Sequence, residues 1–177
     1  MKIERFLLPQ IQESLIPGKV VVLYGPRQVG KTTLVKDLLA EIPQRGRFIN
    51  ADELRYREIL GSQNLQKLNE LINDTEVLII DEAQRVPEIG LNLKIMIDAH
   101  PQLKILATGS ASFDLANKIS EPLTGRKLTF SLFPVSFPEI SQTLGSWEAR
   151  EQLDRWLIWG GYPDIVTTST PELRERL

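Results

Sequence analysis

The sequence contains no cysteine and a single histidine, His100. The lack of cysteine excludes disulfides, zinc–thiolate sites and thiol nucleophiles, and it fits a reducing compartment. One histidine cannot form a histidine-based metal cluster. Because His100 comes directly before Pro101, we interpret it as a solvated residue at the end of a helix.

The chain also lacks long apolar segments and a strong excess of charge of one sign. No stretch approaches 18 consecutive apolar residues, and the N-terminus has mixed charge rather than an apolar signal core. We therefore expect a cytoplasmic protein without a membrane partner. The net charge of -2 does not support nucleic acid as a partner of this chain.

Short apolar runs alternate with stretches of helical periodicity. Strands are predicted at 20–24, 48–50, 76–80, 104–108 and 127–130, and helices at about 3–15, 31–42, 53–73 and 89–97. This alternation is typical of β-α-β units. It predicts a three-layer α/β fold with a parallel sheet of about five strands and helices on both faces.

The last part of the chain has a different composition. Residues 131–145 are expected to form a loop or short helix, and 147–159 a helix whose tryptophans pack in a core or between domains. A further helix is predicted to begin at Thr170 and Pro171. A helix of about seven residues is marginal alone, so we expect the natural protein to continue beyond it. The expected division is a first domain over 1–145 and, over 146–177, a helical lid or the start of a truncated domain.

The pattern G-x-x-x-x-G-K-[ST] lies between the first predicted strand and the next helix. Its glycines allow backbone N–H groups to face phosphates, and the helix begins at the same point. Lys31 would contact the β and γ phosphates, and the Thr32 hydroxyl would bind Mg²⁺. The predicted nucleotide-binding residues of this segment are Gly25, Pro26, Arg27, Gln28, Val29, Gly30, Lys31, Thr32 and Thr33.

Arg27 has two interpretations within this loop. Its side chain could contact phosphate, or it could pair with an acidic residue and shape the loop, which we favour slightly. The alternative for the whole pattern is a glycine turn followed by an ordinary surface lysine. The flanking strand and helix favour the phosphate loop.

Asp81 and Glu82 follow the apolar run 77–80. An acid at the end of a buried strand requires compensation, which a magnesium ion facing the phosphate loop would supply. Asp81 is thus the second predicted metal residue. Glu82 could orient or deprotonate the water that attacks the γ phosphate. The alternative is a solvated loop with two acids.

Five segments together resemble a known family. They are GPRQVGKTTL (25–34), LIIDEAQRVPEI (78–89), LATGSAS (106–112), LTGRKLTFSLFPVSFPEI (123–140) and GGYPDIV (160–166). They look like AAA-superfamily ATPases of bacteria and archaea in which the ATPase domain precedes a C-terminal domain of uncharacterised function. That domain is absent from this sequence.

The resemblance implies further features of the site. A strand ending at Thr108 would separate the phosphate-loop strand from the Asp81 strand, and Thr108 or Ser110 would sense the γ phosphate. Arg126 would act as an arginine finger in a neighbouring subunit, implying a homo-oligomer. Pro163 would pack near adenine. The alternatives are turn-capping hydroxyls, a surface arginine, and a helix cap formed by the Gly-Gly and proline.

The resulting prediction is an ATPase that uses ATP and Mg²⁺ and couples nucleotide state to the missing domain. Adenine is expected because no Asn-Lys-x-Asp guanine signature follows the third strand. The main alternative is an ATP-dependent switch with negligible turnover. A small-molecule kinase is disfavoured because residues 110–130 contain few basic residues for a lid over the phosphates. Nucleic-acid remodelling is disfavoured because the sequence shows no stripe of basic residues.

Overall fold

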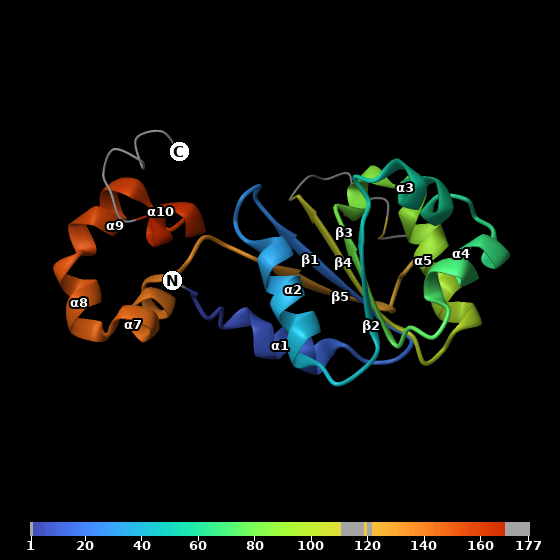
Figure 1. Cartoon of the computed structure of the whole chain (residues 1–177), viewed down its shortest axis with the longest axis horizontal. Coiled ribbons are helices and arrows are strands. Elements are labelled where there is room, and N and C mark those ends of the chain that lie inside the picture. The colour runs from blue at the N-terminus through green and yellow to red at the C-terminus, as the bar shows by residue number, and fades with distance from the viewer. Residues whose placement is uncertain (1, 111–118, 120–121, 169–177) are drawn as a thin grey trace.

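The computed structural model describes residues 2–110, 119 and 122–168. A five-stranded, all-parallel sheet forms its centre, with the strand order β2-β3-β4-β1-β5 (Figure 1). The strands are β1 (Val20–Gly25), β2 (Gly46–Asn50), β3 (Val77–Asp81), β4 (Lys104–Ser110) and β5 (Lys127–Ser131). The α/β fold is confirmed, and β4 separates β1 from β3 as the family resemblance implied.

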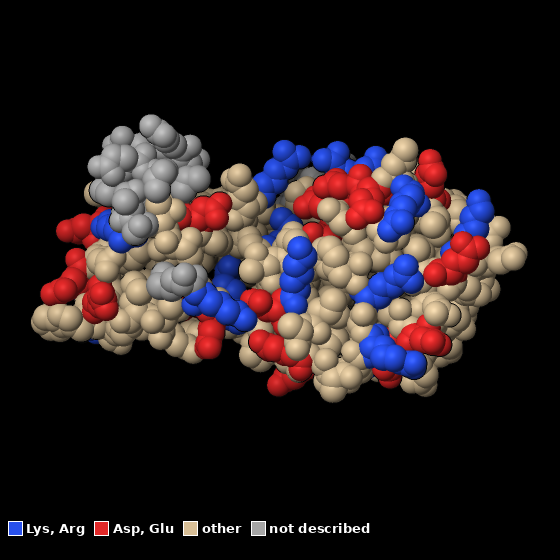
Figure 2. Space-filling model, viewed as in Figure 1, with Lys and Arg blue, Asp and Glu red and all other residues tan. Residues whose placement is uncertain are grey.

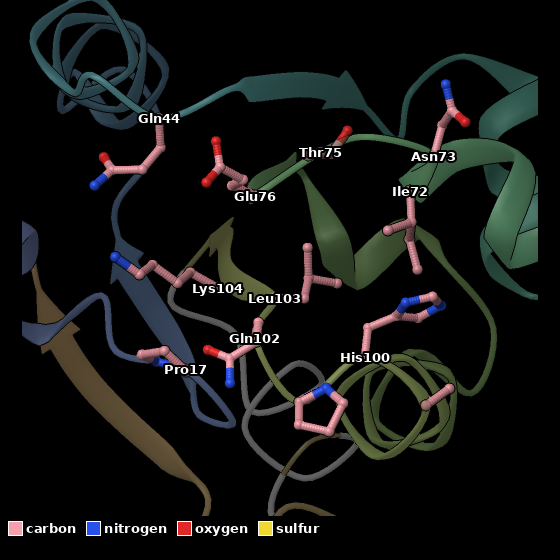
Figure 3. Close-up of a pocket in the computed structure, with 12 residues that line it drawn as sticks. Pro17, Gln44, Ile72, Asn73, Thr75, Glu76, His100, Gln102, Leu103 and Lys104 are labelled. Carbon is pink, nitrogen blue, oxygen red and sulfur yellow. The ribbon is translucent and has the colours of Figure 1, made fainter.

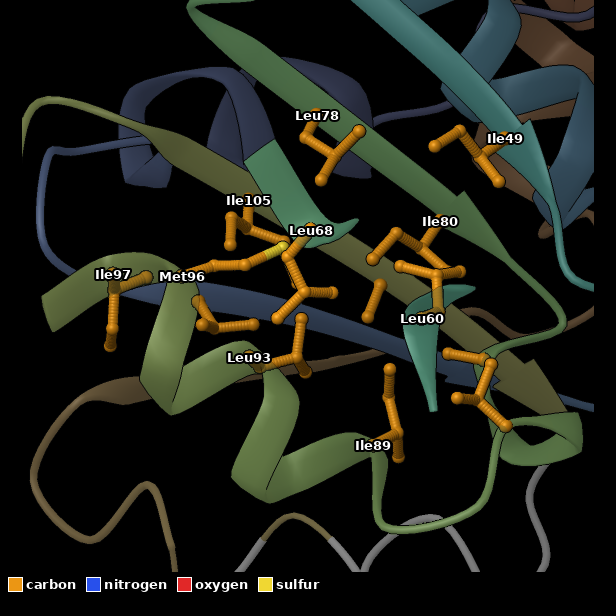
Figure 4. Close-up of a cluster of buried hydrophobic side chains, with 14 of the residues drawn as sticks. Ile49, Leu60, Leu68, Leu78, Ile80, Ile89, Leu93, Met96, Ile97 and Ile105 are labelled. Carbon is orange, nitrogen blue, oxygen red and sulfur yellow. The ribbon is translucent and has the colours of Figure 1, made fainter. Parts of the chain in front are cut away.

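Helices cover both faces of the sheet and make it the middle of three layers (Figure 1). One face packs against α1 (Leu7–Ser14) and α2 (Lys31–Glu41), and the other against α3 (Leu54–Leu60), α4 (Leu65–Ile72) and α5 (Ile89–Ala99). Successive residues of β1 alternate between the two buried clusters, as the two-residue period of a strand requires. Figure 4 shows the cluster on the face covered by α3, α4 and α5, with Leu93 and Met96 of α5 pointing toward the strands.

Three helices differ from the sequence-based expectation, and one of them, predicted over 147–159, is divided in two at Gln152. The helix expected from about residue 3 begins at Leu7, because the preceding segment runs across to another part of the chain, where the Phe6 N–H donates to Glu139 Oε1 (3.0 Å). The stretch 53–73 forms two helices. Gly61 ends α3, and the Asn64 side chain caps α4 by accepting from two backbone N–H groups.

Residues 137–167, here called the helical extension, form α7 (Phe137–Leu144), α8 (Ser146–Glu151), α9 (Leu153–Trp159) and α10 (Pro163–Thr167), at the left in Figure 1. Ser136 and Glu139 form a capping box at the start of α7. The extension has its own buried cluster, in which Ile140 of α7 packs with Trp156 of α9. Trp147, by contrast, is 76% exposed.

The expected division at residues 145/146 falls between α7 and α8, within this cluster. The helix predicted from Thr170 lies outside the described residues. Within the residues that the structure describes, no helix is long and apolar enough to cross a membrane.

Candidate functional site

The loop between β1 and α2 has the backbone geometry of an anion cradle. Gln28 and Gly30 both have left-handed conformations, with φ of 62° and 94°. Gly25 is packed so closely that a Cβ atom there would lie 2.6 Å from the carbonyl oxygen of Leu132. The loop delivers the chain into α2 at Lys31, where the first N–H groups have no partners within the helix. Such N–H groups are available to bind an anion.

Lys31 lies almost completely buried beneath this loop. Its Nζ donates to the carbonyl oxygens of Gly25 (2.9 Å) and Pro26 (2.7 Å). Burial lowers the pKa of Lys31 from its ordinary value; the nearby Glu82 and Asp81 carboxylates act in the opposite direction, and Arg27 adds to the lowering. Because both hydrogen-bond partners of Lys31 are neutral carbonyl oxygens, a phosphate would offer its ammonium group a stronger, charge-assisted partner.

The Thr32 hydroxyl connects the phosphate-loop helix to strand β3. It donates a hydrogen bond of 2.7 Å to Oδ2 of Asp81, whose side chain is buried at the end of the strand. The other carboxylate oxygen, Oδ1, accepts a hydrogen bond from Thr108 of β4. Three neighbouring elements therefore converge on a single buried carboxylate.

Thr108 is fully buried and uses its hydroxyl in two directions. It donates to Asp81 and accepts from the backbone N–H of Glu82 (3.3 Å). Because a hydroxyl has one hydrogen, this arrangement orients Asp81 and leaves no donor for a phosphate. Strand β4 continues past Thr108 to Ser110, which pairs in register with Gly25.

Glu82 follows Asp81 with a left-handed backbone (φ 56°) that turns the chain into the short helix η1 (Ala83–Arg85). Its Oε2 accepts a hydrogen bond from the side chain of Gln84. Both acids of the predicted pair therefore lie at the phosphate loop, but in different surroundings. Asp81 is buried between hydroxyl groups, whereas Glu82 is half-buried and faces a cavity.

The cavity at this edge of the sheet has a volume of about 440 Å³. Figure 2 shows basic and acidic side chains interspersed on the side of the sheet where α3 lies in Figure 1. The predicted residues that line the cavity are Arg27, Gln28, Gly30, Lys31, Thr32, Thr33, Glu82 and Pro163. The sequence analysis did not identify three further lining residues, Asp52, Arg85 and Asp164. Among the described residues, no acid forms an ion pair with Arg27.

A second cavity, of about 220 Å³, adjoins the first. The two share Gly30, Thr33, Pro163 and Asp164. Apolar walls come from segments far apart in the sequence, namely Ile3, Leu34, Val135 and Pro163. Pro163 lies beside the phosphate loop, since a Cβ on Gly30 would be 3.5 Å from its Cγ. The sequence pattern gave no signal for Ile3 or Val135.

The Gly-Gly segment that precedes Pro163 also has a structural role. Gly160 ends α9 with φ of 80°, and the Gly161 carbonyl accepts from the Val135 N–H at 2.6 Å. Any Cβ on Gly161 would collide with the Val135 carbonyl. The capping interpretation and a place for Pro163 at the cavity are therefore compatible.

Arg126 lies far from this cavity within the same chain. It directly precedes β5, and its carbonyl accepts from the N–H of Val20 at the start of β1 (2.9 Å). It is thus at the amino edge of the sheet, whereas the phosphate loop is at the carboxyl edge. Its half-exposed side chain forms an ion pair with Asp98.

A buried ion pair that sequence reasoning missed supports the phosphate loop from behind. Arg5 Nε donates to Glu139 at 3.1 Å, and both side chains are at least 90% buried. Arg5 also donates to the carbonyl oxygens of Val29 in the phosphate loop (3.1 Å) and of Phe133 before α7 (2.5 Å). The N-terminal segment, the loop and the helical extension therefore meet at one guanidinium group.

Glu139 is held in its charged form. Burial acts to raise the pKa of Glu139, but hydrogen bonds from the Ser136 and Phe6 N–H groups and the Ser136 hydroxyl, with the charge of Arg5, lower it overall. Nothing in the local sequence distinguishes Arg5 from a surface arginine, because its partner is 134 residues away.

The oxygen groups at the loop fit a magnesium ion. Thr32 supplies a hydroxyl and Asp81 a carboxylate, the hard oxygen ligands that Mg²⁺ prefers. Within the described part of the chain, no group of three or more His, Cys, Asp or Glu residues could hold a metal by itself. The donor set is therefore that of an ion shared between one or two protein groups and substrate phosphates.

Comparisons with known proteins agree with this geometry. A family model described as an AAA domain matches residues 17–141. A solved structure of a signal transduction ATPase with numerous domains, which carries a tetratricopeptide repeat sensor and comes from Pyrococcus horikoshii, has a TM-score of 0.58 at 13% identity. The match covers 99% of this chain and 32% of that one, and it supports the fold alone.

Two relatives are uncharacterised proteins. One, from Methanocaldococcus jannaschii, is 27% identical over 94% of this chain and 41% of its own length. The other, from Mycobacterium tuberculosis, is 28% identical over 92% of this chain and 34% of its own length. The chain thus spans about a third to two fifths of the length of these two relatives.

Proposed function

The chain belongs to the AAA domain family, and we propose that it binds ATP with Mg²⁺ at the carboxyl edge of the sheet and hydrolyses the ATP to ADP and phosphate. One observation carries the proposal. The 2.7 Å hydrogen bond between the Thr32 hydroxyl and the Asp81 carboxylate brings together the two groups that would hold the metal, next to a buried lysine.

The phosphates would be bound mainly by the loop and the first turn of α2. Backbone N–H groups of residues 28–33 surround the anion, and Lys31 turns from the Gly25 and Pro26 carbonyl oxygens to the β and γ phosphates. The negative charge of the phosphates would reverse the lowering of the Lys31 pKa that burial produces. Arg27 at the loop surface adds positive charge.

The chemistry would take place on the β3 side of the cavity. Bound Mg²⁺ would neutralise charge on the β and γ phosphates. Thr32 and Asp81 would hold it, with Thr108 as a positioning residue for the Asp81 carboxylate. Glu82 faces the same cavity, and its carboxylate would orient the attacking water and accept its proton. The hydrogen bond from Gln84 fixes that carboxylate.

The nucleoside would occupy the adjoining cavity of about 220 Å³. Its residues Gly30, Thr33 and Pro163 also line the phosphate cavity, so a single nucleotide can extend through both. The walls formed by Ile3, Leu34, Val135 and Pro163 suit the flat apolar faces of a purine. We propose adenine as the base.

The activity of the whole protein would include regions that this chain does not span. Because Arg5 contacts the phosphate loop and Glu139 of the helical extension, nucleotide binding can alter how the extension is held. We propose that the extension relays the nucleotide state to a C-terminal partner domain. We also propose a role in hydrolysis for Ser110 and Arg126. Arg126 lies far from the phosphate cavity of its own chain, so it would have to act at the cavity of a second copy.

Calorimetric titration and a phosphate-release assay test the proposed function. Wild-type protein should bind MgATP and release phosphate, and Lys31→Ala should lose binding by at least about 100-fold. Glu82→Gln should retain binding and lose phosphate release. Binding without release in the wild type would favour the non-hydrolysing switch, and no binding at millimolar MgATP would exclude both functions.

A further inference from the structure

Arg85 and Asp52 form an ion pair at the rim of the phosphate cavity. Arg85 Nε lies 3.3 Å from Asp52 Oδ1, and both side chains are about half exposed. Both residues also line the cavity that contains Lys31, Thr32 and Glu82. An ion pair in this setting contributes little to stability.

The backbone segments that carry Arg85 and Asp52 are held in place by hydrogen bonds to residues at the carboxyl edge of the sheet. Arg85 ends the short helix η1, where its N–H donates to the Glu82 carbonyl (2.9 Å). Asp52 follows β2; the Ala51 N–H donates to the Asp81 carbonyl (2.9 Å), and the Asp52 N–H to the Asn50 side chain (2.9 Å). The positions of Arg85 and Asp52 are therefore tied by backbone hydrogen bonds to those of Glu82 and Asp81.

The position of Arg85 differs from that of the other basic residues that line the cavity. Arg27 and Lys31 belong to the phosphate loop and α2, whereas Arg85 comes from the opposite wall, after β3. A triphosphate bound by the loop would extend its terminal phosphate toward Glu82. Arg85 is three residues beyond Glu82, on the same turn. Its planar guanidinium group can bind two phosphate oxygens at once.

We propose that Arg85 binds the terminal phosphate of ATP and that Asp52 holds the arginine at the rim when this phosphate is absent. The inference rests on the proposed ATP binding. Arg85 then distinguishes ATP from ADP, because only ATP offers an anion that can displace Asp52. In the bound state its charge also stabilises the oxygens of the phosphoryl group being transferred.

Nucleotide titrations of the whole chain test this role. Wild type, Arg85→Ala, Arg85→Lys and Asp52→Asn are titrated in Mg²⁺ with ADP and with a non-hydrolysable ATP analogue. Arg85→Ala should weaken binding of the analogue about tenfold and leave ADP binding unchanged. Arg85→Lys should fall between, since it keeps the charge and loses the two-pronged contact.

Asp52 provides the second half of the test. Asp52→Asn should strengthen binding of the analogue a few-fold, because Arg85 no longer has to leave a carboxylate. In the double variant this gain should disappear, which identifies Arg85 as the group through which Asp52 acts. Arg55→Ala is the matched control, because Arg55 forms a similar exposed pair with Glu53 (3.5 Å) but does not line the cavity.

The outcomes separate this inference from the proposed function. If the wild type binds neither nucleotide, both fail. If it binds nucleotide but its preference for the triphosphate survives Arg85→Ala, or if no preference exists, only the role of Arg85 is excluded. Equal losses for ADP and the analogue would make the pair a structural contact. Thermal unfolding of each variant confirms that it is folded.

Discussion

The two edges of the sheet both carry a cavity, but they differ in what is buried there. The amino-edge cavity is the larger, about 570 Å³ against 440 Å³, and includes Glu76, His100 and Lys104 in its lining (Figure 3). Its acid, Glu76, pairs with Arg45 at 3.6 Å in an exposed ion pair. Cavity size therefore does not distinguish the candidate site.

Buried charge does distinguish it. Among the residues that the structure describes, the buried charged residues are Lys31, Asp81 and Glu139, and the side chain of Arg5 is also at least 90% buried. All four lie at or behind the phosphate loop. Charged groups are costly to bury unless hydrogen bonds, opposite charges or a ligand compensate them. The comparison indicates that the carboxyl edge is built around charge and the amino edge is ordinary surface.

The largest expected difference between the edges concerns their ion pairs. Glu139→Ala leaves the Arg5 guanidinium buried without its carboxylate, so the free energy of unfolding should fall by about 3–5 kcal/mol. Glu76→Ala at the amino edge should have a much smaller effect, because its pair is exposed. Denaturant unfolding of the two variants beside the wild type measures both values.

A milder variant, Glu139→Gln, tests whether the buried pair also helps to hold the phosphate loop. Because Arg5 donates to the Val29 carbonyl, a folded Glu139→Gln protein should bind MgATP several-fold more weakly than the wild type. Unchanged affinity would show that the pair stabilises the fold only.

Two glycines offer a comparison with smaller expected effects. Gly25→Ala at the carboxyl edge places a Cβ against the Leu132 carbonyl, which should cost about 1–3 kcal/mol of stability. Gly18→Ala near the amino edge places its Cβ in ordinary contact with the Pro101 carbonyl oxygen (3.9 Å), but its φ of 71° should cost about 1 kcal/mol. Nucleotide titration should then show weaker binding for Gly25→Ala alone. A similar loss for Gly18→Ala would mean that the edges are coupled.

Much of the carboxyl edge could be predicted because its signals are local. The phosphate loop lies within eight consecutive residues, and Asp81 and Glu82 directly follow an apolar run. The parallel topology then brings these strand ends together. The same topology could have placed Arg126, since a residue that precedes a parallel strand lies at the opposite edge from the loop.

The remainder depended on contacts between distant segments. Arg5 and Glu139 are unremarkable in sequence, because neither periodicity nor a short motif links residues 134 positions apart. Asp52 and Arg85 likewise meet only after β2 and β3 pair. Some local signals were available and were missed. Ser136 and Glu139 have capping-box spacing, and Gly61 with Asn64 marks the break between α3 and α4.

Acid titration gives the smallest expected contrast between the edges. The pKa of Glu139 is lowered in the folded protein, so its charged form stabilises the fold above its ordinary pKa of about 4.5, and this contribution is lost as the pH falls through the lowered value. The stability gap between wild type and Glu139→Gln should therefore be constant from pH 7 to about 5 and close below that.

The pKa of Glu76 is also lowered, first by its hydrogen bond from the Arg45 N–H, but this carboxylate is exposed. Added salt should therefore reduce the pH-dependent difference in stability between the wild type and Glu76→Gln. The corresponding difference for Glu139→Gln should persist, because a buried pair is screened much less. Equal salt sensitivity at both positions would contradict the difference in burial from which the comparison of the two edges begins.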